Sequence, residues 1–305
     1  MMDLNKDMFV IKGKNVEQME TISRPSLSFW QDAWRRFRKN RAAFVGLCII
    51  LVYVLLAIFA PMLSKYGFST MDAAHQHAAP SAAHWFGTDA TGRDQWVRTW
   101  MGARVSLSIG LFAATINMCV GAVIGGFCGF YGGKLDMILM RLMDIQMAIP
   151  TILMAIVISS VLGPGLFNLM VAVGITYIPK FARLTRASVL SIKDQEFIEA
   201  ARAMGASHKR IICLYILPNC AAPLIVQSTL SVANAILFAA TLSFLGLGIQ
   251  PPYPEWGGML SSARPYLRNN AYMSIFPGLA IMFTILSLNF LGDGLRDALD
   301  PKQKR

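Results

Sequence analysis

Apolar residues run along this chain in long stretches, and the polar segments between these stretches are short. A helix needs about 20 mostly apolar residues to cross roughly 30 Å of hydrocarbon. Six stretches meet or approach that length, over 42–63, 107–130, 145–162, 166–178, 221–247 and 273–291. The pattern predicts an all-α, polytopic integral membrane protein with six transmembrane helices.

The composition supports this class of protein. Apolar residues make up 55% of the 305 positions and charged residues 15%, and the mean hydropathy is +0.48. One soluble core cannot bury that much apolar surface. A polar tail of about 40 residues precedes the first apolar stretch, which does not fit a cleavable signal peptide. We therefore expect that stretch to remain as an anchor.

The positions of Lys and Arg predict the orientation, because short cytoplasmic loops retain positive charge. With both termini in the cytoplasm, 22 of the 28 Lys and Arg residues fall inside. The net charge of +11 then follows from membrane topology, and nucleic-acid binding is disfavoured. The expected division is a cytoplasmic tail over 1–41, a first transmembrane helix over 42–63, an extracytoplasmic loop over 64–104, a transmembrane domain of five helices over 105–293 and a cytoplasmic tail over 294–305.

The N-terminal tail contains one amphipathic segment. Its apolar residues recur at helical spacing on one face, and they are Leu27, Trp30, Trp34 and Phe37. Ser28 and Gln31 fit a capping box at its start. The other side is basic, which predicts a helix lying flat in the inner membrane interface with its Arg residues near anionic headgroups. A simple anchor without a gating role is the alternative.

The second apolar stretch contains small residues at a spacing of four, at Gly121, Gly125 and Gly129. Such a stripe lets two helix backbones approach closely in a membrane. We expect a helix-packing face here, and its partner is either in this chain or in another subunit.

Ionisable residues are scarce in the apolar stretches. Asp144 is the main one close to hydrocarbon, and Arg141 is positioned one turn earlier to pair with it. A proton- or ion-coupled transporter needs a relay of such groups. The energy source is therefore expected to lie outside this chain. The five cysteines fall within spans or on the cytoplasmic side, where structural disulfides are not expected.

Motifs for enzymatic or metal chemistry are missing. The sequence contains no G-x-S-x-G elbow, H-E-x-x-H helix or P-loop lysine. His75, His77 and His84 lie in the extracytoplasmic loop without a Cys or carboxylate cluster, so solvated side chains are favoured over a metal site. The nearby stretch GTDATGRD predicts a structural loop, with Arg93 contacting Asp89 or its own neighbour in sequence.

A polar, alanine-rich segment over 194–218 lies between the fourth and fifth stretches, on the cytoplasmic side. Asp194 is expected to cap a short helix that Gly205 ends, and Ser207 to cap a second helix that runs until Pro218. The pattern predicts a helix, a corner and a helix that project from the membrane. Its small side chains leave a surface without large protrusions, which another protein could approach closely.

The order of residues in this segment resembles the EAA loop of the permeases of type I ABC importers. The matching positions are Glu199, Ala200, Ala201, Gly205, Leu217 and Pro218. Tyr215 stands where that family usually has Ile, a difference that concerns the packing of the second helix. The resemblance implies that this loop couples the spans to the closure of a cytoplasmic ATPase.

Five more stretches resemble the C-type permease of dipeptide and oligopeptide importers, namely HWFGTDATGRD, GARVSLSIG, FYGGKLDMILMRLMDI, LSFLGLGIQPPYPEWG and GDGLRDALDP. The resemblance implies the type I ABC importer fold in a bacterial cell membrane. It also implies a non-catalytic subunit without a metal or cofactor of its own. The implied partners are a homologous B-type permease, two ATPases that bind ATP and Mg, an extracytoplasmic substrate-binding protein and the lipid bilayer.

The resemblance leaves the transported solute open. Importers of nickel, glutathione and antimicrobial peptides share much of the same pattern, so each of these solutes is an alternative to peptides. Two alternatives come from other classes of protein. A secondary transporter or channel is disfavoured by the missing ion relay, and a membrane-embedded enzyme by the missing nucleophile or metal site.

Overall fold

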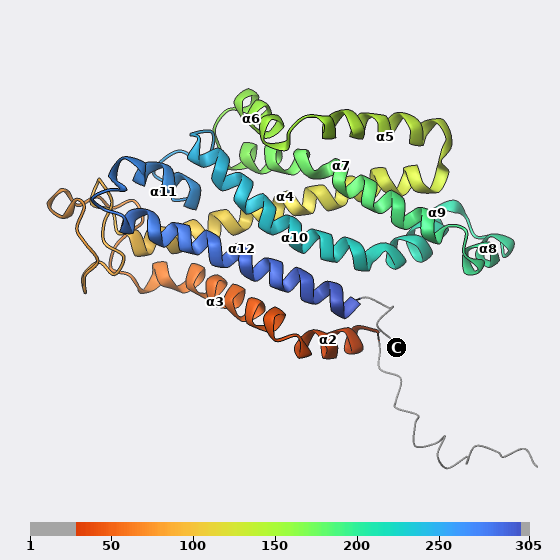
Figure 1. Ribbon diagram of the computed structural model, residues 1–305, viewed down its shortest axis with the longest axis horizontal. Coiled ribbons are helices and arrows are strands. Elements are labelled where there is room, and N and C mark those ends of the chain that lie inside the picture. Colours follow the sequence, from red (N-terminus) through yellow and green to blue (C-terminus); the bar gives the residue numbers. More distant parts are fainter. Residues whose placement is uncertain (1–28, 300–305) are drawn as a thin grey trace, which may run out of the picture.

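The computed structural model describes residues 29–299, which form a long bundle of helices (Figure 1). The α-helices are α2 (Phe29–Lys39), α3 (Arg41–Leu63), α4 (Gln95–Tyr131), α5 (Gly133–Ala148), α6 (Thr151–Leu162), α7 (Leu166–Ile192), α8 (Glu196–Ala203), α9 (His208–Arg210), α10 (Leu217–Phe244), α11 (Trp256–Ala263) and α12 (Tyr272–Leu299). Within the described range, β-structure is limited to one isolated bridge between Thr88 and Asp94. The all-α prediction is confirmed.

The tail helix predicted from the amphipathic pattern corresponds to α2. Leu27 and Ser28, which were expected at its start, lie outside the described residues. Asn40 separates α2 from α3, and its side chain accepts a hydrogen bond from the backbone N–H of Ala43 at 3.2 Å. This cap satisfies one of the free N–H groups at the start of α3.

Four helices of the described chain are long and apolar enough to cross a membrane. They are Arg41–Leu63, Gln95–Tyr131, His208–Phe244 and Tyr272–Leu299. The bent pair formed by α5 and α6 makes a fifth candidate if it is one span. The described residues therefore support four or five apolar spans, and the predicted number of six is not confirmed.

The segment predicted as one helix over 145–162 is broken in the structure. α5 ends at Ala148, α6 begins at Thr151, and the two helix axes differ in direction by 94°. Proline disfavours the helical conformation of the residue before it. Ile149, which precedes Pro150, is accordingly extended, with φ −85° and ψ 129°.

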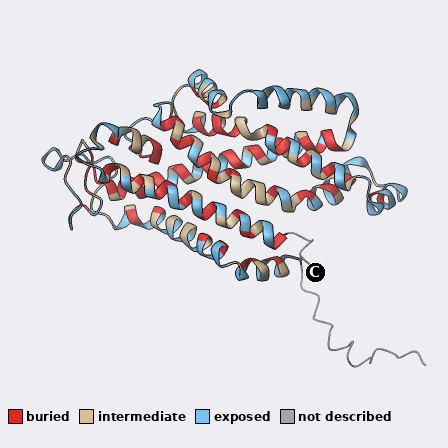
Figure 2. Ribbon diagram, viewed as in Figure 1, coloured by how far each residue is buried: buried red, intermediate tan, exposed pale blue. Residues whose placement is uncertain are grey.

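α4 is the central helix, and it packs against α3, α7 and α10. Toward one end of the bundle, Trp100 of α4 joins Ile236 and Trp256 in a buried cluster. Further along α4, Ile109 packs with residues of α7 and α10. Figure 2 shows this buried interior as red segments along α4, α7 and α10, whereas α5 is largely exposed.

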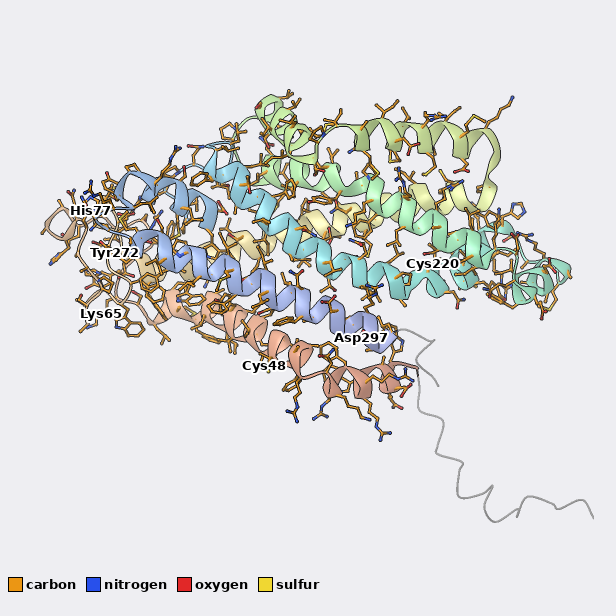
Figure 3. The ribbon with its side chains drawn as sticks, in the orientation of Figure 1. Cys48, Lys65, His77, Cys220, Tyr272 and Asp297 are labelled. Carbon is orange, nitrogen blue, oxygen red and sulfur yellow. The ribbon has the colours of Figure 1, made fainter. Side chains whose placement is uncertain are left out.

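The segment over 64–94 and α11 lie together at one end of the bundle (Figure 1). Figure 3 places Lys65, His77 and Tyr272 at this end, Cys48 near the middle of the bundle's length, and Asp297 and Cys220 further toward the opposite end. In the loop GTDATGRD, Asp89 accepts a hydrogen bond from Arg93 Nε at 2.6 Å. The predicted contact between Arg93 and Asp89 is thus present.

The prediction of solvated histidines needs one correction. His84 is buried, and its Nδ1 atom lies 2.9 Å from Oδ2 of Asp94. Asp94 also accepts a hydrogen bond from the backbone N–H of Val97 and so caps α4. The buried His84 thus contacts the carboxylate that caps α4. Within residues 29–299, no group of three or more His, Cys, Asp or Glu side chains is arranged to hold a metal ion.

The predicted pairing of Asp144 with Arg141 is wrong. Arg183 on α7 donates a hydrogen bond from Nη2 to Oδ1 of Asp144 at 2.6 Å. Asp136 of α5 is likewise paired with Arg186 of α7. α5 lies along α7, so both carboxylates face cations of the neighbouring helix.

Candidate functional site

The segment over 194–218 projects from the end of the bundle that also carries α2 and the end of α12 (Figure 1). α8 begins at Glu196, with Gln195 in the extended conformation before it. The predicted side-chain cap at Asp194 is wrong, because the N-cap is Gln195 and it makes no side-chain capping bond. Two acidic residues in the first turn, Glu196 and Glu199, favour the helix start through the helix dipole.

Gly205 forms the corner, as predicted. Its φ is +79°, in the left-handed region that favours glycine. The N–H of Gly205 donates to the carbonyl of Arg202 at 2.9 Å, and the N–H of Ala206 donates to the carbonyl of Ala201 at 3.0 Å. These two bonds form the Schellman motif that ends α8. A Cβ atom added at Gly205 would meet no atom within 4 Å, so the backbone conformation is what requires glycine here.

Ser207 starts the second helix of the loop, as predicted, because its hydroxyl accepts the N–H of Arg210 at 3.4 Å. The predicted end at Pro218 is wrong. α9 continues through a π-helical segment, Ile211–Ile216, into α10, and Pro218 lies in the first turn of α10. A proline has no N–H to donate and is tolerated in the first turn of a helix. The loop is therefore continuous with the apolar helix that follows it.

The inner side of this loop is anchored in the bundle. Ile198 and Ala201 of α8 are 0% and 1% exposed. Ile198 belongs to a buried cluster with Phe181 of α7 and Cys220 of α10. The guanidinium of Arg202 lies 5.8 Å from the centroid of the Phe130 ring at the end of α4. The loop is thus in contact with α4, α7 and α10.

The outer side of the loop is exposed. Glu199, Ala200 and Ala203 are exposed, and Met204 at the corner is 79% exposed. Within the described residues, no ion pair engages Glu199. Methionine is enriched at protein–protein interfaces, and the small side chains of Ala200 and Ala203 leave room for another protein to approach α8 closely.

The residues singled out from the EAA pattern thus divide into three groups. Glu199, Ala200 and Gly205 lie on the exposed surface, and Ala201 faces the buried side. Leu217 is half-buried and Pro218 is exposed at the base of the loop. The anchors Ile198, Ile211 and Ile216 were missed by the sequence reasoning, although Ile198 and Ala201 show the i, i+3 spacing of a buried helix face.

The glycine stripe of α4 faces α7 of the same chain. A Cβ atom added at Gly121 would collide with Cβ of Phe181, and one added at Gly125 would collide with the carbonyl oxygen of Ala182. At Gly129 it would lie 2.8 Å from Cβ of Val189. The two helices therefore approach so closely along this stripe that α4 has no room there for a larger side chain.

Residues 121–305 match the family described as binding-protein-dependent transport system inner membrane component. Residues 28–80 match the N-terminal TM domain of oligopeptide transport permease C.

Three relatives match most of the chain. The dipeptide transport system permease protein of Alkalihalophilus pseudofirmus is 47% identical, covering 92% of each chain. The oligopeptide transport system permease protein of Bacillus subtilis is 44% identical over the full length of both. A glutathione transport system permease protein of Escherichia coli O157:H7 is 44% identical over 90% of this chain and 91% of its own.

A solved structure of the MetNI methionine ABC transporter in inward-facing conformations has a similar fold. Its matched chain aligns with a TM-score of 0.54 and 20% identity, covering 67% of this chain and 96% of that chain.

Proposed function

Because the chain belongs to the family of binding-protein-dependent transport system inner membrane components, we propose that it is a permease subunit of an ATP-driven peptide importer. Relatives named as dipeptide and oligopeptide permeases match it over 92% to 100% of their length, which supports peptides as the solute. In this proposal the chain forms half of the translocation pathway and catalyses no reaction. Two cytoplasmic ATPase subunits bind ATP and Mg, and an extracytoplasmic binding protein delivers the peptide.

The two-sided burial of the loop over 194–218 is the main support for this proposal. Its outer surface is exposed, while Ile198 and Ala201 on its inner side are buried. Packed protein interiors are nearly incompressible, so a displacement of α8 is transmitted to the helices that its buried face contacts. We propose that Glu199, Ala200 and Gly205 dock on an ATPase and that ATP-driven closure moves α4, α7 and α10 through this cluster.

The base of the loop supports the same proposal. Leu217 and Pro218 lie where the π-helical segment meets α10. A π-helical turn is a local departure from regular helix that often occurs at functional sites. We propose that Leu217 and Pro218 act there as the joint between the docking surface and the membrane helix.

An exposed apolar face of α5 supports a second permease subunit as partner. Its side chains recur at helical spacing and are between 47% and 61% exposed, namely Leu135, Ile138, Leu142 and Ile145. The face that α5 turns toward α7 holds the ion pairs of Asp136 and Asp144 instead. We propose that a homologous B-type permease covers the apolar face, so that the two chains enclose the pathway between them.

The arrangement of the ends supports the proposed orientation. α2, the projecting loop and the end of α12 lie at one end of the bundle, and the segment over 64–94 lies at the other (Figure 1). We propose that the first end is cytoplasmic, together with both termini, and that the second meets the binding protein.

Peptide uptake by cells that produce the whole transporter tests the coupling. We expect Glu199→Lys and Gly205→Val each to lower uptake, because the first reverses a charge on the docking surface and the second strains the corner of the loop. The expected loss is at least roughly tenfold, which corresponds to about 1.4 kcal/mol of docking free energy. Gly163→Val is the matched control, since Gly163 has a φ of +78° and equally open surroundings but lies after α6. It carries the same backbone strain without touching the loop.

The amount of permease in the membrane must be equal in all these strains. If Glu199→Lys and Gly205→Val transported peptide as the wild type does, the docking role would be wrong. Uptake of glutathione without uptake of dipeptides would keep the coupling and replace the solute.

A further inference from the structure

An apolar groove lies between α2 and the ends of α3, α10 and α12. Its volume is about 230 Å³, and every side chain that lines it is apolar. Phe37 of α2 is 4% exposed and packs with Ala43 and Ala298. Trp30 and Trp34, which also line the groove, remain 60% and 53% exposed. An apolar space with half-exposed tryptophans is suited to the interface between headgroups and hydrocarbon.

The remaining sides of α2 are basic. The exposed cations of this region are Arg35, Arg38, Lys39 and Arg41. Asp32 is already paired with Arg36 at 2.9 Å, and no ion pair in the described part of the chain engages the four exposed cations. Asp297 of α12 accepts a hydrogen bond from the side chain of Asn40 at 3.3 Å. Uncompensated positive charge thus lies beside the apolar groove.

The groove adjoins the membrane-facing surface of α3. Leu47 of α3 lines it, while Phe44 and Val45 on the same helix are 43% and 52% exposed. A lipid molecule in the adjacent leaflet can therefore enter the groove sideways without leaving the membrane. An aqueous ligand would have to cross the headgroup region to reach the same walls.

We propose that this groove binds an acyl chain of an anionic phospholipid whose phosphate contacts the exposed cations of α2 and α3. The apolar walls select hydrocarbon, and the cations select negative charge at the headgroup level. A zwitterionic lipid fills the groove equally well but leaves the positive charge uncompensated. The site is independent of the transported solute and of the docking loop.

Native mass spectrometry of the purified full-length chain, equilibrated with equal amounts of phosphatidylglycerol and phosphatidylcholine in detergent, tests the site. We expect phosphatidylglycerol to be retained at least about tenfold more often, since each nearby Lys or Arg contributes severalfold to attraction of anionic lipid. Replacing Arg35, Arg38 and Lys39 together by Gln removes that preference. Equal retention of the two lipids by the wild type overturns the proposal without any variant.

Two controls separate the groove from general charge. Replacing Lys65, Arg264 and Arg268 by Gln removes the same charge from exposed positions outside the groove and leaves the preference unchanged. Ala33→Phe fills the groove without changing charge and lowers retention, because Ala33 lines the groove. Equal loss in the two triple variants, or full retention by a monodisperse Ala33→Phe protein, overturns the groove site. Increased lipid retention after deletion of residues 2–28 would mean that this segment fills the groove, which also overturns it.

Discussion

The close approach of α4 and α7 predicts that two adjacent glycines respond oppositely to the same substitution. A Cβ atom added at Gly125 collides with the carbonyl oxygen of Ala182 and lies 2.9 Å from the backbone nitrogen of Arg186. One added at Gly126 meets no atom within 4 Å. Gly125→Ala and Gly126→Ala therefore differ in whether α7 must move.

The expected magnitude follows from two terms. Replacing glycine by alanine inside a helix favours the helix by about 1 kcal/mol at either position. Overpacking costs about 1–3 kcal/mol. The atoms that crowd Gly125 are two backbone atoms and Cβ of Thr185, and none of them can rotate away as the end of a flexible side chain can. The helix term cancels between the two variants. Gly125→Ala should consequently be about 1–3 kcal/mol less stable than Gly126→Ala, which should equal or exceed the wild type in stability.

Unfolding of the purified proteins in mixed micelles with increasing dodecyl sulfate, followed by circular dichroism, measures these free energies of unfolding. The two variants carry the same chemical change one residue apart, so each is the control for the other. Equal stability of the two variants, or a more stable Gly125→Ala, would refute the close packing of α4 against α7.

Two further predictions concern the ends of the bundle. In a background without the native cysteines, an impermeant thiol reagent should label a Cys introduced at Ser81 in intact cells. A Cys introduced at Ser207 should react only after the membrane is opened. Labelling at position 207 in intact cells would contradict the proposed orientation. Burial acts to raise the pKa of the Asp89 carboxyl. Hydrogen bonds from the backbone of Arg93 and from the side chain and backbone of Thr91, together with the charge of Arg93, outweigh burial, so the pKa of Asp89 is lowered. The lowered pKa means that ionised Asp89 stabilises the folded segment at pH values above the ordinary carboxyl pKa. This stabilisation is lost as the pH falls through the lowered pKa of the folded state, so amide hydrogen exchange over 64–94 should accelerate below about pH 4. Exchange that stays unchanged there after correction for intrinsic rates would contradict it.

The features that depend on local chemistry could be predicted from the sequence. The run of apolar residues without a charge predicted the helix that became α3, and its end at Leu63 agrees with the structure. Gly205 and Ser207 were identified as corner and cap because a left-handed turn and a free N–H group each favour few residue types. These signals lie within a few residues of the feature that they determine.

The features that depend on contacts between distant segments could not be predicted. Asp144 pairs with Arg183, 39 positions away, because α5 lies along α7, and no pattern in either segment specifies that placement. Pro218 is a helix breaker by local rules, yet the π-helical segment before it joins it to α10. The break at Ile149 was indicated locally by the proline that follows it. The apolar residues on both sides nevertheless led to the prediction of one continuous helix.

Transport by defined components in proteoliposomes tests the central claim most directly. The chain alone should neither hydrolyse ATP nor move peptide, because the proposal assigns ATP to the partner subunits. Together with a second permease and two ATPases, it should show hydrolysis stimulated by peptide-loaded binding protein, which favours one state of the transporter by differential affinity. Peptide uptake should then withstand a proton ionophore and disappear when the Walker lysine of the ATPases is replaced. Uptake by this chain alone, driven by a proton or sodium gradient, would contradict the account.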